Sequence, residues 1–168
     1  FRDVAANAEP VLAGRALLQI GVIYRHTLME PRLALQTHQE FQKRPGAGSH
    51  PGYAISERAV KSLSAALGEV DAVEARIVAA ATDGERVPLL MEVGALYRDR
   101  LDASKYGYDA YQRAFLASKE SHDVAYYMMA YSMMEWGDLE EAAAMFEVFM
   151  MRFPTSYLFP SALELEYR

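Results

Sequence analysis

A short pattern of side-chain sizes recurs three times in this 168-residue chain and restricts its fold more than any other feature. Each copy has two large apolar residues three apart, a small residue directly after the second, and a large residue three further on. The copies are Leu17, Ile20, Gly21 and Tyr24; Leu90, Val93, Gly94 and Tyr97; and Tyr126, Met129, Ala130 and Met133. Such steps place the large side chains on one face of an α-helix, beside a small residue that lets a second helix approach. The pattern therefore predicts paired helices.

Glycine and proline divide the rest of the chain into segments of helical length. Pro31 suits the first turn of a helix, the stretch 45–52 has the composition of a loop, and Gly68 and Gly137 indicate further breaks. No segment shows the alternation of a strand, so the sequence predicts an all-α fold. The expected helices cover residues 10–29, 31–44, 53–67, 69–81, 87–101, 105–118, 121–136 and 139–153, with a ninth from about 160. Ser121 and Asp138 are the expected N-caps of the seventh and eighth helices.

The clearest copy continues in a way that is typical of one known family. Its first helix is followed by a Gly137–Asp138 turn, then by Ala142 and Phe146 in a second helix, and by Pro154. This unit resembles the tetratricopeptide repeat. The resemblance implies a right-handed superhelical stack of about four helix–turn–helix units in a single domain, residues 1–168, because one unit alone cannot bury its apolar face. The expected units are 10–45, a degenerate copy at 53–82, 87–118, 121–154, and the start of a further helix at 160–168.

The segment after the last complete unit carries a second resemblance. The sequence from Phe153 to Ala162 contains Pro154, Ser156 and Pro160, and it is similar to the proline–serine linker of bacterial envelope repeat proteins. Those proteins include the Tol–Pal-associated periplasmic protein and the outer-membrane-assembly lipoprotein. The resemblance implies a periplasmic or envelope-associated location, with the cytoplasm as the alternative.

Charge disfavours two classes of ligand. The formal net charge is −6, and all of it comes from residues 121–168, which hold eight acidic and two basic side chains. Residues 1–120 hold 15 of each sign, so no basic stripe is available for nucleic acid. The same acidity disfavours anionic membrane surfaces, and no apolar run of about 18 residues could span a bilayer. The expected partners are therefore proteins.

The residue types of common catalytic and metal sites are absent or wrongly spaced. The chain has no cysteine, and its histidines, His26, His38, His50 and His122, form no pair at the spacing of a metal motif. His38 lies on an apolar face, which favours a core or interface histidine whose polar atoms are satisfied. We therefore predict no enzyme activity, no catalytic residue, no cofactor and no metal site.

Seven of the nine methionines lie between Met128 and Met151. Thioethers can bind copper(I), so a Met-rich copper carrier is one interpretation. Flexible hydrophobic packing between two helices is another, and an adaptable binding surface is a third.

The tetratricopeptide resemblance implies that the first helices line a concave groove. Mapped unit by unit, it predicts these partner-binding residues: Leu18, Val22, Arg25, Met91, Arg98, Tyr127, Tyr131 and Met134. They are mostly apolar or aromatic, and the lysines and asparagines of the family's carboxylate-clamp members are missing. We therefore expect an apolar peptide, helix or subunit surface as the ligand, with Arg25 and Arg98 available for a carboxylate.

The function predicted from the sequence is that of a non-catalytic scaffold or adaptor subunit in a larger bacterial assembly. Its partners are expected to be other protein subunits or peptides, with homo- or hetero-oligomers possible through the C-terminal end. Alternatives are a helical non-catalytic domain of a larger enzyme and the Met-rich copper(I) carrier.

Overall fold

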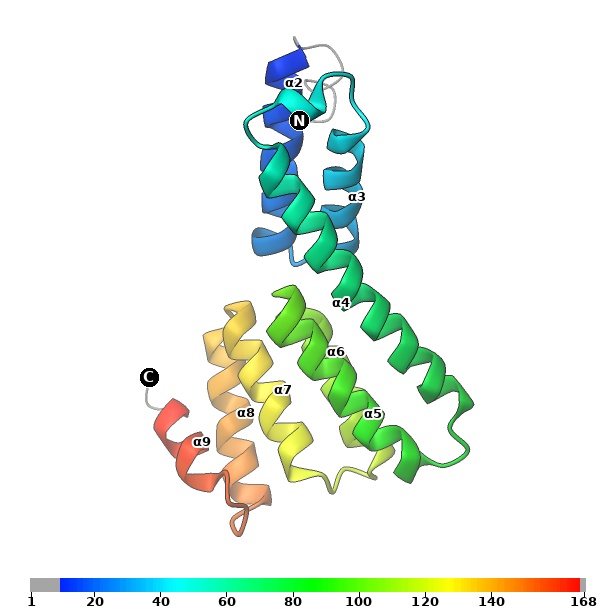
Figure 1. The fold of residues 1–168 in the computed structure, drawn as a ribbon. Helices are drawn as coiled ribbons and strands as arrows, with labels where there is room; N and C mark the ends of the chain where they lie inside the picture. The colour runs from blue at the N-terminus through cyan, green and yellow to red at the C-terminus, as the bar shows by residue number, and fades with distance from the viewer. Residues whose placement is uncertain (1–9, 167–168) are drawn as a thin grey trace. The chain divides into compact units, whose positions relative to one another are not determined.

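The described part of the chain is helical throughout. The computed structural model describes residues 10–166, which contain eight α-helices and no strand (Figure 1). This confirms the all-α fold class. The helices are α2 (Pro10–Val22), α3 (Pro31–Gln42), α4 (Tyr53–Ala79), α5 (Asp83–Ala95), α6 (Ser104–Ala117), α7 (Asp123–Trp136), α8 (Leu139–Arg152) and α9 (Phe159–Glu166).

The chain forms two compact units, and the boundary between them falls inside α4, between Glu69 and Val70. The described part of the first unit comprises residues 10–69 and Leu101–Ala103. In this unit α2 packs against α3. Its core is built from side chains of α2, α3 and the loop that follows α3, namely Leu17, Ile20, Phe41 and Ala47. The apolar face predicted for residues 10–29 is therefore the face that α2 buries.

The second unit contains the remainder of α4 and the helices α5 to α9. Each helix from α5 onward packs against the next one along the chain. The largest fully buried side chains of this unit include Tyr111 of α6 and Phe146 and Phe149 of α8. Met129 and Met133 of α7 are buried too, which assigns these two methionines to helix packing. Sequential pairing of neighbouring helices is the arrangement that the short connections predict.

The small residues of the recurring pattern mark close contacts between paired helices. A Cβ atom added to Gly94 of α5 would lie 2.5 Å from the ring of Tyr111 in α6. One added to Gly21 of α2 would lie 2.8 Å from Nε2 of His38 in α3. Ala130 of α7 has no exposed surface. The predicted role of the small position is confirmed at these sites.

The helix pairs α2–α3 and α5–α6 share further features at an offset of 73 residues. The first helix of each pair runs into a single π-helical turn, Ile23–Thr27 in one and Leu96–Arg100 in the other. A residue with positive φ follows, Met29 or Asp102, each with φ of 53°. The next helix begins at Pro31 or Ser104. The two pairs are thus built alike, down to the same local departures from α-helical geometry.

Helix α4 differs from the sequence prediction. A turn was expected at Gly68, but a single helix of 27 residues runs from Tyr53 to Ala79. Residues 53–82 therefore do not form the helix pair that a degenerate repeat requires. The buried residues Leu63, Leu67, Val70, Val73 and Ile77 continue at helical spacing on both sides of the glycine. Burial of these side chains, at about 1.5–3 kcal/mol each, outweighs the roughly 1 kcal/mol cost of glycine in a helix.

Capping side chains fix three helix starts. Thr82 and Glu85 form a reciprocal capping box at α5, so this helix begins at Asp83 and not at the expected 87. His122, not Ser121, caps α7, because its Nδ1 accepts the backbone N–H three residues on. Asp138 caps α8 as predicted, through the same type of bond.

We expect Gly68→Ala to stabilise the protein by about 0.5–1 kcal/mol, because Gly68 is mid-helix and a Cβ there meets nothing within 4 Å. The measurement is urea unfolding followed by circular dichroism. The matched control is Gly94→Ala, where the new methyl group would collide with Tyr111 and should destabilise the protein. A Gly68→Ala variant that is less stable than the wild type would contradict an unbroken α4.

Candidate functional site

Helix α2 has two apolar faces, and only one of them is buried. Ala13, Leu17 and Ile20 lie in the core. A second line of side chains, Val11, Arg15, Leu18 and Val22, recurs at steps of four, three and four residues. These steps place its members on one face of the helix. Within this line Val11 is 59% exposed and Val22 is 44% exposed. This second face forms one wall of the candidate site.

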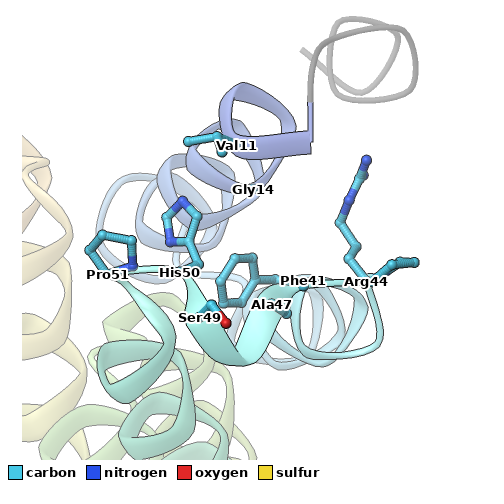
Figure 2. A pocket seen from close by; sticks show the side chains of 10 residues that line it. Val11, Gly14, Phe41, Arg44, Ala47, Ser49, His50 and Pro51 are labelled. Atoms are coloured by element: carbon cyan, nitrogen blue, oxygen red, sulfur yellow. The ribbon is translucent and has the colours of Figure 1, made fainter.

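The second face of α2 borders a cavity of about 350 Å³. The cavity is walled on the other side by the loop before α4 and by the first turn of α4. Its lining residues are Val11, Arg15, Leu18, Gln19, Val22, His38, His50, Pro51, Gly52 and Ile55. A smaller cavity of about 210 Å³ shares Val11, His50 and Pro51 with it and extends to Phe41 and Arg44 (Figure 2). We call the two together the α2 groove.

The loop of residues 45–52, predicted from its composition, positions one wall of the groove. The ring of His50 points towards α2 beside Phe41 (Figure 2), with the two rings edge to face at 5.3 Å. His50 Nδ1 accepts the backbone N–H of Gly52 at 3.0 Å, so a neutral ring carries its proton on Nε2. Glycines allow the loop and α2 to approach, since Gly14 lies under the His50 ring and Gly52 lies against Leu18.

His38 is the buried polar side chain of the groove. It is 3% exposed and its Nδ1 has no hydrogen-bond partner. Burial, assisted by the positive charge of Arg25, lowers the pKa of His38 below its ordinary value of 6.5. The side chain therefore favours its neutral form in the folded protein. The prediction that His38 is buried is confirmed, but the prediction that its polar atoms are satisfied is wrong at Nδ1.

The charged side chains among the described lining residues of the groove are both arginines. Arg15 lines the larger cavity and Arg44 lines the smaller one, and the described residues of both linings include no aspartate or glutamate. Arg15 has no ion pair or side-chain hydrogen bond with another described residue. The groove thus combines apolar walls with an arginine that forms no ion pair with another residue of the range 10–166.

The structure brings two of the predicted partner-binding residues together in the groove and places a third elsewhere. Leu18 and Val22 line the larger cavity. Arg25 lies in the π-helical turn and pairs with Asp102 at 3.1 Å. It is not a lining residue of either cavity, so its charge is engaged inside the first unit.

The other predicted residues lie in the second unit. Met91, Tyr131 and Met134 are half-buried. Arg98 is 5.5 Å from the centre of the Tyr131 ring and bonds Asp99 at 2.7 Å. Arg98, Tyr131 and the Sδ of Met128, 3.5 Å from Arg98 Nη1, form one contact cluster. Neither cavity of the α2 groove borders this cluster.

The prediction that Tyr127 faces a partner is wrong. Its exposed fraction is 9%, and its ring packs 5.5 Å from Phe146 and 5.7 Å from Phe149. It is therefore a core residue between α7 and α8 and is not available to a partner. The spacing placed it on the outward face of α7, but the aromatic side chains of α8 cover that position.

Of the ten residues that line the larger cavity, only Leu18 and Val22 were in the predicted set. His50 and Pro51 come from the loop, and Ile55, which is 57% exposed, comes from the first turn of α4. Helical spacing cannot find them, because they reach the groove through the packing of α2, the loop and α4. The only sequence signal was the predicted loop itself.

Comparisons with known proteins assign no family to this chain. No known family model matches it, and no curated protein or solved structure is significantly similar to it. The tetratricopeptide relationship consequently remains a prediction that rests on the residues alone. Within residues 10–166 there is also no helix long and apolar enough to cross a membrane, and no cluster of three or more His, Asp or Glu suited to a metal.

We expect Gly52→Ala to lower the free energy of unfolding by about 1 kcal/mol, because its Cβ would overlap Leu18 Cδ1 and force that side chain to move. The matched control is Gly48→Ala in the same loop, where a Cβ meets nothing within 4 Å. Both changes restrict the unfolded chain equally, so the difference in thermal stability between the two variants reports on the contact between residue 52 and Leu18. Equal stabilities would show that Gly52 and Leu18 do not pack together.

We expect His38 to make the protein less stable as the pH falls below about 6.5. The unfolded chain then binds a proton at this residue before the folded chain does, because the folded-state pKa is lower. The free energy of unfolding decreases until the pH is below the folded-state pKa as well. Urea unfolding of wild type and His38→Gln between about pH 5 and 7 measures this. An unchanged pH dependence in the variant would mean that His38 is not protected from protonation.

Proposed function

We propose that this chain is a non-catalytic scaffold that holds a partner protein, and that the α2 groove receives an apolar segment of that partner. The proposal extends the prediction made from the sequence, and it moves the centre of the binding surface onto α2. The lining of the groove includes aliphatic side chains, a phenylalanine, two prolines, two imidazoles and two arginines, which suits binding better than bond-breaking chemistry.

The observation that carries the proposal is the exposure of apolar side chains around a cavity. Val11, Val22 and Ile55 are each exposed by 44% or more, and all three line the same space of about 350 Å³. Leaving apolar surface in water costs about 25 cal/mol per Å². Isolated exposed aliphatic residues are ordinary, but a group of them around a hollow is typical of an interaction site.

The dimensions of the groove favour a helix or short peptide. From Val11 to Val22 the second face of α2 covers eleven residue steps, which is roughly 16 Å along the axis at 1.5 Å per residue. Three turns of a partner helix have the same length. Binding of an amphipathic helix along an apolar groove is a common mode of peptide recognition.

We further propose that the helix pairs are tetratricopeptide-like units and that the protein belongs to a larger bacterial assembly, with an envelope location as the expected setting. The recurring size pattern and the 73-residue offset between α2–α3 and α5–α6 support the first part. The proline–serine segment between Phe153 and Ala162 supports the second.

The groove is tested with a displayed library of random 14-residue peptides, selected on the wild-type chain. We expect peptides enriched in apolar residues that bind at least about tenfold more weakly to Leu18→Glu, because this change places a charge in the apolar wall. The matched control is Val78→Glu, on a fully separate stretch of α4, where an apolar side chain is already 84% exposed.

Binding that survives Leu18→Glu but is lost in Tyr131→Ala would place the partner on the second unit instead. A library that yields no peptide sensitive to either variant would contradict the scaffold proposal. Circular dichroism of each variant checks that its helices are intact.

A further inference from the structure

Arg15 is the charged side chain in the middle of the second face of α2. Arg15 lies between Val11 and Leu18 on this face, is exposed, and has no ion pair with another described residue. Several other arginines of the described chain are paired within their own unit, as Arg76 is with Glu92 and Arg113 is with Glu74. An arginine with apolar neighbours and no intramolecular partner is well placed for a carboxylate from another molecule.

The surroundings of Arg15 reinforce its charge. Residues 10–69 contain seven lysines and arginines and four glutamates, whereas the whole chain has a net charge of −6. None of the described residues that line the α2 groove is acidic. Apolar walls reduce the screening of a charge by water, so an ion pair formed there is stronger than one on an open surface.

The backbone of the partner segment is also constrained. An extended peptide needs hydrogen-bond partners for its N–H and C=O groups, and α2 offers none because its own backbone groups are bonded within the helix. A helix satisfies its backbone internally and presents only side chains. The groove therefore favours a helical occupant.

We propose that the α2 groove binds an amphipathic helix of a partner protein whose apolar face lies on Leu18, Val22 and Ile55 and whose carboxylate pairs with Arg15. This inference rests on the proposed scaffold function and specifies its ligand. Arg15 and Leu18 lie within one turn of each other on α2. The acidic residue and the apolar residue of the partner that contact them should therefore also lie within one turn of each other on the partner helix.

The test is a library of 15-residue peptides designed as amphipathic helices, with leucine and isoleucine on one face. At each position bordering that face, glutamate, glutamine and lysine are varied. Selection is carried out on the full chain as wild type and as Arg15→Glu. The matched control is Arg58→Glu, an exposed arginine of α4 in the same unit that lines neither cavity and makes the same change in net charge.

We expect glutamate to be enriched over lysine at one bordering position on the wild type, and lysine to be enriched there on Arg15→Glu. The selected glutamate peptide should bind Arg15→Glu at least about tenfold more weakly, and its binding to the wild type should weaken as salt is raised. Arg58→Glu should keep the preference for glutamate.

Three outcomes would overturn the proposal, and they are distinguishable. Peptides that depend on Leu18 but show no preference for glutamate would leave the scaffold function standing and refute the carboxylate. A library without any Leu18-dependent binder would refute both. Sedimentation that shows the wild type to self-associate, and Arg15→Glu to be a monomer, would mean that a second copy of this chain occupies the groove.

Discussion

Contact between an aromatic ring and the bare backbone of a glycine is the interaction on which both helix pairs depend. The ring of His38 lies over Gly21, and the ring of Tyr111 lies over Gly94. A methyl group at either glycine would push the paired helices apart, and interiors packed at crystal density cannot absorb such a shift without loss. The π-helical turn and the positive-φ residue follow at the same offsets in both pairs. Both helix pairs thus combine a ring-on-glycine contact with the same backbone conformation between the two helices. The ring is an imidazole in one pair and a phenol in the other.

The parts of the fold that could be predicted are those set by side-chain burial. The size pattern around Gly21, Gly94 and Ala130 predicted paired helices, because close packing demands a small residue at a fixed step from large ones. Helix α4 was mispredicted since Gly68 was interpreted as a break. Glycine weakens a helix without ending it, and the buried residues on both sides hold α4 together. The local composition thus predicted a break at Gly68, whereas tertiary packing keeps the helix continuous.

The candidate site was predictable only in part, and the reasons are geometric. Leu18 and Val22 lie in the regular part of α2, where the 3.6-residue period holds. Arg25 lies in a π-helical turn, which bonds residues five apart instead of four and shifts all later side chains around the axis. Beyond this turn, the 3.6-residue period no longer predicts the helix face on which a side chain lies. His50 and Ile55 belong to other segments, and their place beside α2 depends on the loop path and on close contacts at Gly14 and Gly52.

Helix α4 also affects how the protein can be cut. The boundary between the two units lies between Glu69 and Val70, inside a continuous ladder of helical hydrogen bonds. Proteases need an extended stretch of backbone and prefer exposed loops. Trypsin should therefore cleave after Lys43, near the edge of the 45–52 loop, sooner than in the middle of α4, whereas the bond after Arg44 resists trypsin because Pro45 follows it. A fragment that ends at Glu69 would leave four carbonyl groups of the severed helix without their partners.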